Sequence, residues 1–512
     1  MLWLVVFLVA CVLYYSRNRL RYFSSRGVKT LPPIPFLGNL TAVTFGRENF
    51  VEAVGAGYEA FKDQRYFGLY QYLVPTLVPR DPELIRQIMV RDFHAFADRG
   101  VHIEADSDPL FGRNLIMLTG SKWRAMRVKL SPAFSSARCR YMAPLMRDAA
   151  RNVADYLSQK ICKPQLVDTN KITMAYVNDV IASCAFGFAV DSLKDPNNCI
   201  FKLGQKAVIQ DTFQIMKFFG YENMKSVMKL MNVKIIPTED ADKFSELFKS
   251  ALQARREKKV EPRPDFIQIL VDAAQGKEHL YMYIELDFFY TVYTDDDLVA
   301  QAVLFYVAGY DTTANLINYF LYEMAMNPDV QEKLQKELDQ IPGDDVDNLY
   351  EVIQGLEYLD MCVSEVLRLW PLVGTTDRRS VATYDFGPTY EGSQHRLIAP
   401  PGIHIWVPIY SIHRDEKYWP EPNRCIPERF SSERKGEIVP YTYMPFGTGP
   451  RHCLGSRFAV LAAKIFVLGF LRRFRAQRAR AARLAPHAFI LRPAHGYQLG
   501  VTPRCANNYN TS

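Results

Sequence analysis

The chain has 512 residues, 48% of them hydrophobic and 13% aromatic, and a formal net charge of +7. This length and composition exclude a disordered protein and allow a large buried core. Its nine cysteines include no CxxC pair. That pattern argues against a disulfide scaffold, a zinc site or an iron–sulfur cluster, and it favours a reducing compartment. The positive charge is modest and no nucleic-acid-binding module is visible, so nucleic acid is not an expected partner.

The first 16 residues are apolar and uncharged, and a basic run with Arg17, Arg19 and Arg21 follows them. A membrane-spanning helix needs about 17 to 25 mostly apolar residues, so this segment requires its flanks to complete a span. A cleaved signal peptide is the alternative, but no basic residue precedes the apolar run and no clear small-x-small site follows it. The downstream positive charge predicts an uncleaved anchor at 1–16, a basic and proline-rich hinge at 17–39, and a main domain at 40–512 on the cytosolic side.

A long apolar segment begins at Asp295 and ends before Pro328. Its first residues are acidic, as is typical of a helix amino terminus, and it is apolar on all sides, which predicts a helix that crosses the core. In its middle, residues 308–313 read Ala-Gly-Tyr-Asp-Thr-Thr. One explanation is structural: a threonine donates back to a backbone carbonyl, and the glycine permits close packing. The other is functional, because a buried acid is costly unless paired or used, and a weak point in the helix admits oxygen or water.

Two later segments indicate a buried ion pair. Glu365 and Arg368 lie three residues apart on a predicted helix that ends before Pro371, among apolar residues that predict burial. A buried pair of this kind needs a third partner, and Arg429 in the segment 427–430 (PERF) offers one. Alternating segments such as 404–410 (HIWVPIY) predict short strands, so the fold class is mainly α with small β-sheets.

The segment 445–455 (PFGTGPRHCLG) surrounds Cys453 with glycines. Three interpretations compete: a structural loop with a buried thiol, half of a metal or redox pair, or a lone thiolate presented to a cofactor. The lack of a CxxC pair argues against the second. His452, beside the cysteine, is an alternative ligand.

These segments together resemble the cytochrome P-450 monooxygenases over essentially the whole chain. The resemblance rests on the proline-rich hinge, the long helix, Glu365-x-x-Arg368, the PERF segment and the Cys453 loop, which fits Phe-Gly-x-Gly-x-Arg-x-Cys-x-Gly at every fixed position. It implies the cytochrome P-450 fold preceded by a single transmembrane helix, a haem-thiolate catalytic domain at 40–512, and haem b as the cofactor.

The resemblance also implies the roles of residues in the loop. Cys453 is expected to be the axial iron ligand, because a thiolate pushes electron density that favours cleavage of an O–O bond. Gly447, Gly449 and Gly455 are expected to let the backbone turn tightly and bring N–H groups near the sulfur. Gly455 would start a helix whose positive end faces the thiolate. Phe446 is expected to exclude water from the ligand, and Arg451 to bind a haem propionate.

Other residues match the family by position. Trp123 and Arg127 resemble propionate contacts, and so does Arg378, for which Arg379 is the rival. A Phe and Met stripe is more often core than pocket wall. The resemblance nevertheless implies a substrate pocket lined by Phe111, Phe213, Phe305, Ala308, Val373 and Thr375.

Glu365, Arg368 and Arg429 resemble the buried network that braces the haem side of the family fold. Asp311 and Thr312 match the family's proton-delivery acid and alcohol, which is the work of a general acid.

The implied function is insertion of one atom of O2 into a lipophilic small molecule that is xenobiotic, steroid-like or fatty-acid-like. The sequence has no Gly-x-Gly-x-x-Gly after a strand and no flavin module, so electrons are expected from NADPH through a separate membrane-bound reductase, with cytochrome b5 as a second candidate donor. Segments 92–100 and 263–273 resemble the animal microsomal branch, which implies the endoplasmic reticulum membrane. Ala462 departs from the pattern, because family members often carry glutamate there.

Two alternative functions remain open. A haem-thiolate isomerase or dehydratase rearranges a peroxide without a reductase, and a haem-binding gas sensor is not an enzyme at all. The Asp311–Thr312 pair argues against the first, since such an enzyme needs no proton relay to split dioxygen. The pair and the apolar access region argue against the second.

Overall fold

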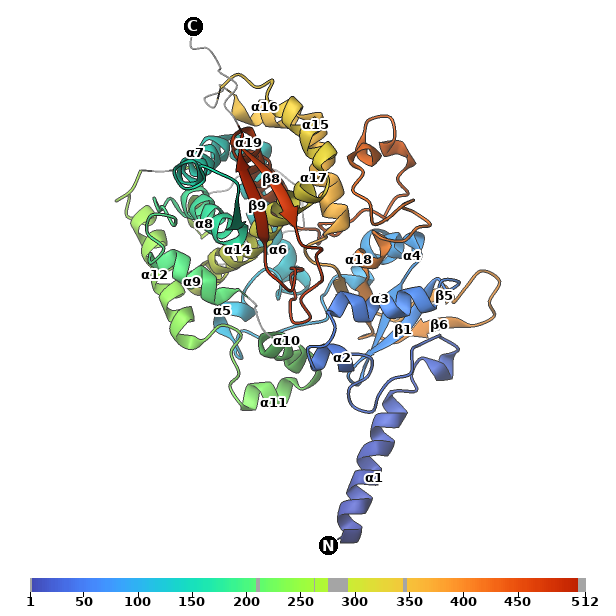
Figure 1. Cartoon of the computed structure of the whole chain (residues 1–512). Helices are drawn as coiled ribbons and strands as arrows, with labels where there is room; N and C mark the ends of the chain where they lie inside the picture. The colour runs from blue at the N-terminus through green and yellow to red at the C-terminus, as the bar shows by residue number, and fades with distance from the viewer. Residues whose placement is uncertain (1, 209–211, 262, 275–292, 344–347, 505–512) are drawn as a thin grey trace.

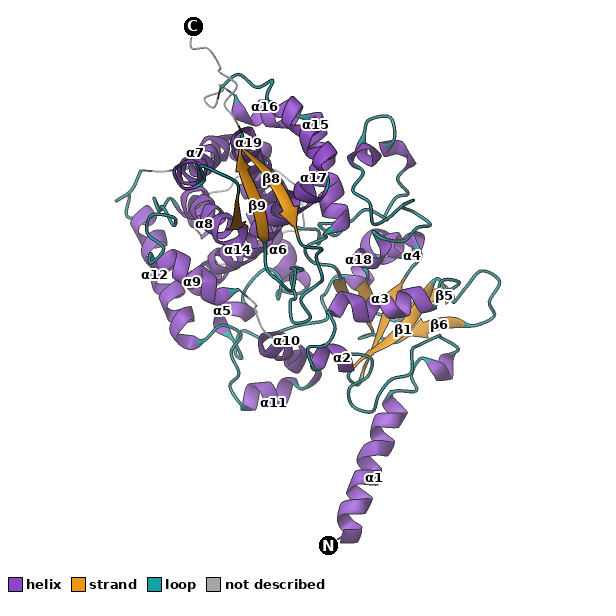
Figure 2. Ribbon diagram, viewed as in Figure 1, coloured by secondary structure: helices purple, strands orange, loops and turns teal. Residues whose placement is uncertain are grey.

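The computed structural model describes residues 2–208, 212–261, 263–274, 293–343 and 348–504, and the chain is mainly helical with small sheets, as predicted (Figures 1 and 2). The α-helices are α1 (Leu2–Arg19), α2 (Thr41–Thr44), α3 (Phe50–Ala60), α4 (Pro82–Arg86), α5 (Pro109–Gly112), α6 (Gly120–Leu130), α7 (Ser136–Lys160), α8 (Thr169–Ile181), α9 (Cys199–Ala207), α10 (Thr212–Asn223), α11 (Lys225–Leu230), α12 (Thr238–Arg256), α13 (Phe266–Ala274), α14 (Asp295–Met326), α15 (Pro328–Leu338), α16 (Leu349–Gly355), α17 (Glu357–Leu369), α18 (Ile409–Ile412) and α19 (Ser456–Arg473).

The strands form three small sheets, shown in orange in Figure 2. One sheet has the order β1-β2-β7-β4, a second has the order β3-β9-β8, and β5 pairs with β6. Their bounds are β1 (Tyr66–Gln71), β2 (Val74–Pro79), β3 (Gln165–Asp168), β4 (Thr376–Arg379), β5 (Tyr384–Pro388), β6 (Arg396–Ala399), β7 (His404–Val407), β8 (Phe474–Ala479) and β9 (Gln498–Pro503). The predicted strand at 404–410 is shorter than expected, because Pro408 has no N–H to continue the ladder and α18 follows.

Helix α1 projects from the body of the molecule and is almost entirely exposed (Figure 1). The apolar stretch at Leu2–Arg26 is long and apolar enough to cross a membrane. The helix continues through Arg19, beyond the predicted end of the anchor at residue 16, so basic residues occupy its last turn. The hinge after it is tied to the sheet by the bridges Thr30–Gly68 and Gly38–Gln71.

Helix α14 crosses the helical part of the body and packs against α8, α19 and β8. Its start is fixed by a capping box, in which the Thr294 hydroxyl accepts from the Asp297 N–H and the Asp297 carboxylate accepts from the Thr294 N–H. It ends at Met326 because Pro328 begins α15. The predicted core helix is therefore confirmed in both position and length.

Two apolar cores stabilise the body. The larger one contains buried residues of α7, α8, α14, α17 and α19. The smaller one contains those of α3, the strands β1, β2 and β7, and the β5-β6 hairpin. The Cys453 loop leads directly into α19, so the larger core fixes the position at which the loop ends.

Candidate functional site

The loop that carries Cys453 is held by its own backbone. Gly447 and Gly449 have φ angles of 72° and 73°, in the left-handed region that side chains rarely adopt. The Gly447 N–H donates to the Met444 carbonyl at 2.9 Å, and the Cys453 N–H donates to the Phe446 carbonyl at 2.9 Å. These turns place Cys453 immediately before α19.

The Cys453 side chain has accessible surface although protein surrounds it, as expected for a residue facing an internal space. Burial raises the pKa of its thiol, and this is the largest effect. Hydrogen bonding from the backbone N–H groups of Gly455 and Ser456 lowers the pKa, as do the nearby charges of Arg127 and Arg99. These four groups would stabilise a sulfur anion at the first turn of α19, although burial outweighs them in the free thiol.

Gly455 differs from the other two glycines of the loop. Its φ is −87°, and a Cβ atom there would lie 3.6 Å from the Phe134 ring, an ordinary contact. The turn at residues 454–455 therefore does not depend on a left-handed angle at Gly455. Its part is to cap α19 and direct its N–H toward the sulfur.

His452, the alternative ligand, is exposed, and its Nδ1 lies 2.8 Å from the Gly449 carbonyl oxygen. Because a carbonyl only accepts, Nδ1 donates to it. That bond turns the imidazole toward its own loop.

Four arginines beside the Cys453 loop lie close enough for their charges to lower the pKa of their neighbours in the group: Arg99, Arg127, Arg378 and Arg451. Burial, and after it the charges of neighbouring arginines, lower the pKa of Arg378 to about 9 and that of Arg451 to about 9. Two carboxylates, Asp98 and Asp377, oppose them. Four positive and two negative groups leave an excess of two positive charges in a mostly buried cluster.

Sequence reasoning did not assign Arg99. The residue lies in the segment 92–100 that the resemblance used, but nothing local distinguishes it from a surface arginine. In the fold it donates to Asp377 at 2.7 Å, which brings it to β4 and Arg378.

Strand alternation separates Arg378 from its rival, Arg379. Arg378 is 1% exposed, and its Nε has no hydrogen-bond partner in the described part of the chain, whereas Arg379 is exposed. Arg451 makes contacts that the sequence did not predict, because it donates to the carbonyls of Ala97 and Leu118 and lies 4.2 Å over the Trp123 ring. Its guanidinium is therefore largely held by protein groups.

Asp311 and Thr312 are adjacent in α14, but their side chains meet different surroundings. The Asp311 carboxylate is buried and accepts from Arg492 at 2.7 Å and from Asn315 at 2.9 Å. Burial raises the pKa of Asp311, while Arg492 and Asn315 lower it. Thr312 donates to the Ala308 carbonyl at 2.6 Å, as the structural explanation expected.

The middle of α14 nevertheless carries an accessible stripe. Leu304, Phe305, Ala308, Gly309 and Thr312 have accessible surface, although most of the helix is buried. Their spacing places them on one helix face. The helix is continuous here, so no break admits water, and the glycine packs closely, since a Cβ on it would lie 3.1 Å from Ile181 of α8.

The Glu365 carboxylate is fully buried and binds two arginines. Arg368 donates to it through Nε at 2.7 Å and Nη2 at 2.8 Å, and Arg429 Nε lies 3.4 Å from Oε1. The Ile426 N–H adds a third donor at 2.9 Å. Arg368 also donates to the His413 carbonyl at 2.8 Å, so the network links α17 to PERF and to the segment that precedes it.

The residues predicted to line the pocket occupy different environments. Phe111 of α5 forms an edge-to-face pair with Phe218 of α10 at 5.5 Å. Phe213 is 68% exposed on the outside of α10, so the helical phase points Phe218, which the sequence reading missed, inward instead. The Phe305 ring packs with Phe134 and Phe266 at 5.1 and 4.6 Å, which favours a core role.

After α17, Val373 and Thr375 are half-buried. The Thr375 hydroxyl is buried without a hydrogen-bond partner among the described residues. A hydroxyl in that state is suited to meet a polar group of a bound molecule. The predicted placement of Thr375 at the pocket stays a prediction.

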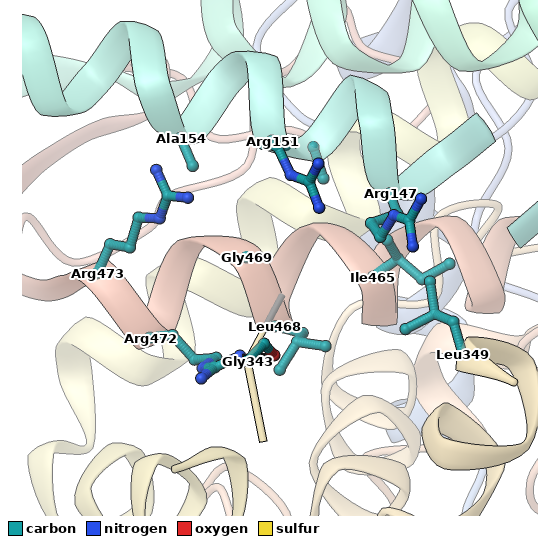
Figure 3. A pocket seen from close by; sticks show the side chains of 11 residues that line it. Arg147, Arg151, Ala154, Gly343, Leu349, Ile465, Leu468, Gly469, Arg472 and Arg473 are labelled. Atoms are coloured by element: carbon teal, nitrogen blue, oxygen red, sulfur yellow. Dashed lines mark hydrogen bonds between the residues drawn. The ribbon is translucent and has the colours of Figure 1, made fainter. Parts of the chain in front are cut away.

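A separate groove of about 450 Å³ lies between α7 and α19 (Figure 3). Four arginines reach into it, Arg147, Arg151, Arg472 and Arg473, and Asp148 and Asp155 pair with two of them. Cys453 and the accessible face of α14 do not line it, so we do not assign the reaction to this groove.

A lone thiol at a helix amino terminus beside a surplus of two buried positive charges defines a haem-thiolate class of protein. In a haem-thiolate protein a cysteine thiolate would hold the iron of haem b, and the two propionates of the group would match that surplus and the unpaired Nε of Arg378. The residues present therefore fit the group.

The family model for cytochrome P-450 matches residues 28–501. Cytochrome P-450 9e2 of Blattella germanica is 37% identical over 88% of this chain and 87% of its own length. Probable cytochrome P-450 9f2 of Drosophila melanogaster is 34% identical over 98% of this chain and all of its own length. Lithocholate 6-beta-hydroxylase of Mesocricetus auratus is 31% identical over 92% of this chain and 90% of its own length.

The chain belongs to the cytochrome P-450 family. It is therefore an oxygen-incorporating oxidoreductase with haem b as its cofactor, and in this enzyme class NADPH supplies the electrons through a reductase.

Gly449→Ala is expected to prevent stable haem loading. A Cβ atom there would lie 1.9 Å from the Met89 carbonyl oxygen, and the left-handed backbone adds about 1 to 2 kcal/mol of strain. Haem per folded protein, measured by absorbance and circular dichroism, should fall sharply. Gly436→Ala is the matched control, because its Cβ would meet no described atom within 4 Å. Equal haem content in both variants would contradict a tight loop at Gly449.

Proposed function

We propose that this chain is a membrane-anchored haem-thiolate monooxygenase with Cys453 as the axial ligand, which inserts one atom of O2 into a lipophilic small molecule. The observation that supports this most is the Cys453 thiol itself, desolvated yet accessible and facing the N–H groups of Gly455 and Ser456. Bound haem supplies the activation of dioxygen. The chain stabilises the sulfur anion through the first turn of α19 and balances the propionates with Arg378, Arg127 and Arg99.

Proton delivery is assigned to Thr312 with Asp311 behind it. The Thr312 hydroxyl lies on the accessible stripe of α14, and its oxygen keeps lone pairs that accept while its proton is donated to the Ala308 carbonyl. Asp311 faces Arg492 and Asn315 on the buried side, where burial raises the pKa of its carboxyl. A carboxyl group with a raised pKa keeps its proton to a higher pH than an ordinary one, so it has a proton to give as a general acid.

The substrate is proposed to be apolar, because apolar side chains line both the expected pocket and the groove beside α10. Phe111 and Phe218 meet between α5 and α10. A mostly apolar groove of about 230 Å³ lies beside α10, lined by Val43, Thr44, Tyr72, Ile215, Met216, Phe219, Pro486 and His487. The relative named lithocholate 6-beta-hydroxylase supports hydroxylation as the reaction. Xenobiotic, steroid-like and fatty-acid-like compounds all fit this chemistry.

Helix α1 and the surface beside it support a membrane location. In Figure 1, α2, α10 and α11 lie on the lower side of the body, from which α1 projects. That side exposes Phe45, Leu230 and Met231, which supports contact with lipid. We assign the protein to the endoplasmic reticulum membrane, anchored by 1–16 through the hinge 17–39, with the catalytic domain 40–512 in the cytosol. A membrane-bound NADPH-dependent reductase is the proposed electron donor and cytochrome b5 a second one.

Thr312→Ala is expected to uncouple electron use from product formation. Haem content, the carbon monoxide spectrum and substrate binding should persist, and NADPH oxidation should continue. Product per NADPH should fall about tenfold or more, with hydrogen peroxide released, because the hydroxyl that passes the proton is gone. The measurement uses the chain reconstituted with reductase and a panel of lipophilic compounds.

Thr313→Val is the matched control, since the Thr313 side chain is fully buried beside Thr312. Equal coupling in wild type and Thr312→Ala would sink the relay assignment. Activity on a peroxide substrate that needs no reductase and ignores Thr312 would instead identify an isomerase or dehydratase. Ligand binding without turnover of any compound would identify a sensor.

A further inference from the structure

His413 lies between the Glu365 network and the Cys453 loop. The side chain is fully buried at the end of α18. Its Nδ1 lies 3.1 Å from the Arg368 carbonyl oxygen, and its Nε2 accepts from the Met444 N–H at 2.8 Å. Its own carbonyl accepts from Arg368 Nη1 at 2.8 Å. The ring also stacks on Tyr443 at 5.5 Å with an interplanar angle of 19°.

These partners fix the tautomer of the imidazole. A backbone N–H only donates, so Nε2 is the acceptor for Met444, and a carbonyl only accepts, so Nδ1 carries the proton. Burial, with a smaller effect of the Arg368 charge, lowers the pKa of His413 to about 3, so the ring stays neutral at ordinary pH. The hydrogen bond to the Arg368 carbonyl therefore needs a protonated Nδ1, and the hydrogen bond from the Met444 N–H needs an unprotonated Nε2.

The bond to Met444 reaches the start of the loop. The Met444 carbonyl accepts from Gly447, and the Phe446 carbonyl accepts from Cys453. Hydrogen bonds therefore connect the Glu365 carboxylate, through Arg368 and His413, to Met444, and from there to the turns that position the Cys453 backbone. Tyr443 adds a second tie, since its hydroxyl donates to the Ser364 carbonyl of α17 at 3.0 Å.

We propose that His413 is a positioning residue that fixes the Cys453 loop to the Glu365–Arg368 network through its two ring nitrogens. The proposal rests on the proposed function, in which Cys453 ligates iron. His413 does not touch the reacting atoms in this assignment. Its Nε2 acceptor is the group that holds the loop, because the Met444 N–H, if left buried and unsatisfied, would favour displacement of the loop.

Two amide variants separate the two ring bonds. In His413→Gln the amide oxygen can take the place of Nε2 and accept from Met444. In His413→Asn the shorter amide can take the place of Nδ1 and donate to Arg368, and the Met444 N–H loses its acceptor. The reduced proteins are held under carbon monoxide, and conversion of the thiolate-type spectrum to the type without thiolate is followed in time. We expect His413→Asn to convert about tenfold faster than wild type and His413→Gln to stay within about twofold.

A second readout does not depend on haem spectra. Hydrogen exchange of the peptide that contains Met444 should be faster in His413→Asn and unchanged in His413→Gln. The control pair is His404→Gln and His404→Asn, because His404 is a buried histidine of β7 that contacts Glu222 of α10. Both control variants should keep the wild-type conversion rate and Met444 exchange.

The outcomes are decisive in each direction. Equal conversion and equal Met444 exchange in His413→Asn and His413→Gln would show that the ring only fills space. If His413→Asn does not accumulate, His413→Gln decides. A folded His413→Gln protein that lacks the thiolate-type spectrum, or loses it much faster than wild type, overturns the proposal. A wild-type protein that lacks the thiolate-type spectrum would instead refute Cys453 as ligand, which is a failure of the proposed function and not of the His413 contact.

Discussion

Cys453→His is expected to move the carbon monoxide spectrum of the reduced protein from the thiolate type to the imidazole type and to abolish product formation. The Cys453 sulfur faces the N–H groups of Gly455 and Ser456, which favour an anion there. An imidazole is neutral and cannot push electron density toward iron as a thiolate does. The absorbance of the reduced carbon monoxide complex checks this result directly.

Two controls make the assignment specific. Cys199→Ser removes an exposed thiol elsewhere, and His452→Ala removes the neighbouring imidazole, which already donates to Gly449. Both should retain the thiolate-type spectrum. A Cys453→His protein with the wild-type spectrum would show that another residue ligates the iron, and a shift caused by His452→Ala alone would point to His452.

Glu365→Ala is expected to yield little or no haem-loaded protein. The carboxylate is fully buried between Arg368 and Arg429, so its removal strands two buried guanidinium groups. Breaking a buried ion pair by removing one partner costs about 3 to 5 kcal/mol, a large share of the stability of an ordinary domain. Haem absorbance per total protein, together with thermal unfolding followed by circular dichroism, measures the loss.

Glu428→Ala is the matched control from the PERF segment. Glu428 pairs with Lys333 at 2.7 Å, but both side chains are largely exposed, at 42% and 57%. An exposed pair is worth about 0 to 1 kcal/mol, so this variant should load haem normally. If Glu365→Ala loads haem as well as Glu428→Ala, the Glu365 network is not a brace for the haem side.

Much of the fold was predictable because its signals are local. The three acids after Thr294 and the proline at 328 bound α14, and Pro371 follows the end of α17. Such signals act within one turn of the chain, through capping bonds and missing N–H groups. The length of the strand at β7 was less predictable, because a single proline decided where pairing stopped.

Most residues of the candidate site could be named from the sequence, but their arrangement in space was less predictable. The spacing of Gly447, Gly449 and Cys453 identified the loop, and the left-handed angles of the two glycines agree with the turn that was expected there. Gly455 caps α19, as expected, and its turn does not need the left-handed angle found at the other two glycines. Arg99 was missed, since only the fold brings its segment to Asp377.

The sequence by itself determined the family, the long helix that begins at Asp295 and the thiol with its glycines, because each depends on residue type and short spacing. The tertiary structure alone decided which side chains face inward: Phe218 rather than Phe213 on α10, and Arg378 rather than Arg379 on β4. It also brought His413 to the Cys453 loop. The physical reason is that helical phase, strand face and the partner of a buried polar group are chosen by packing between segments far apart in the chain, which no local pattern specifies.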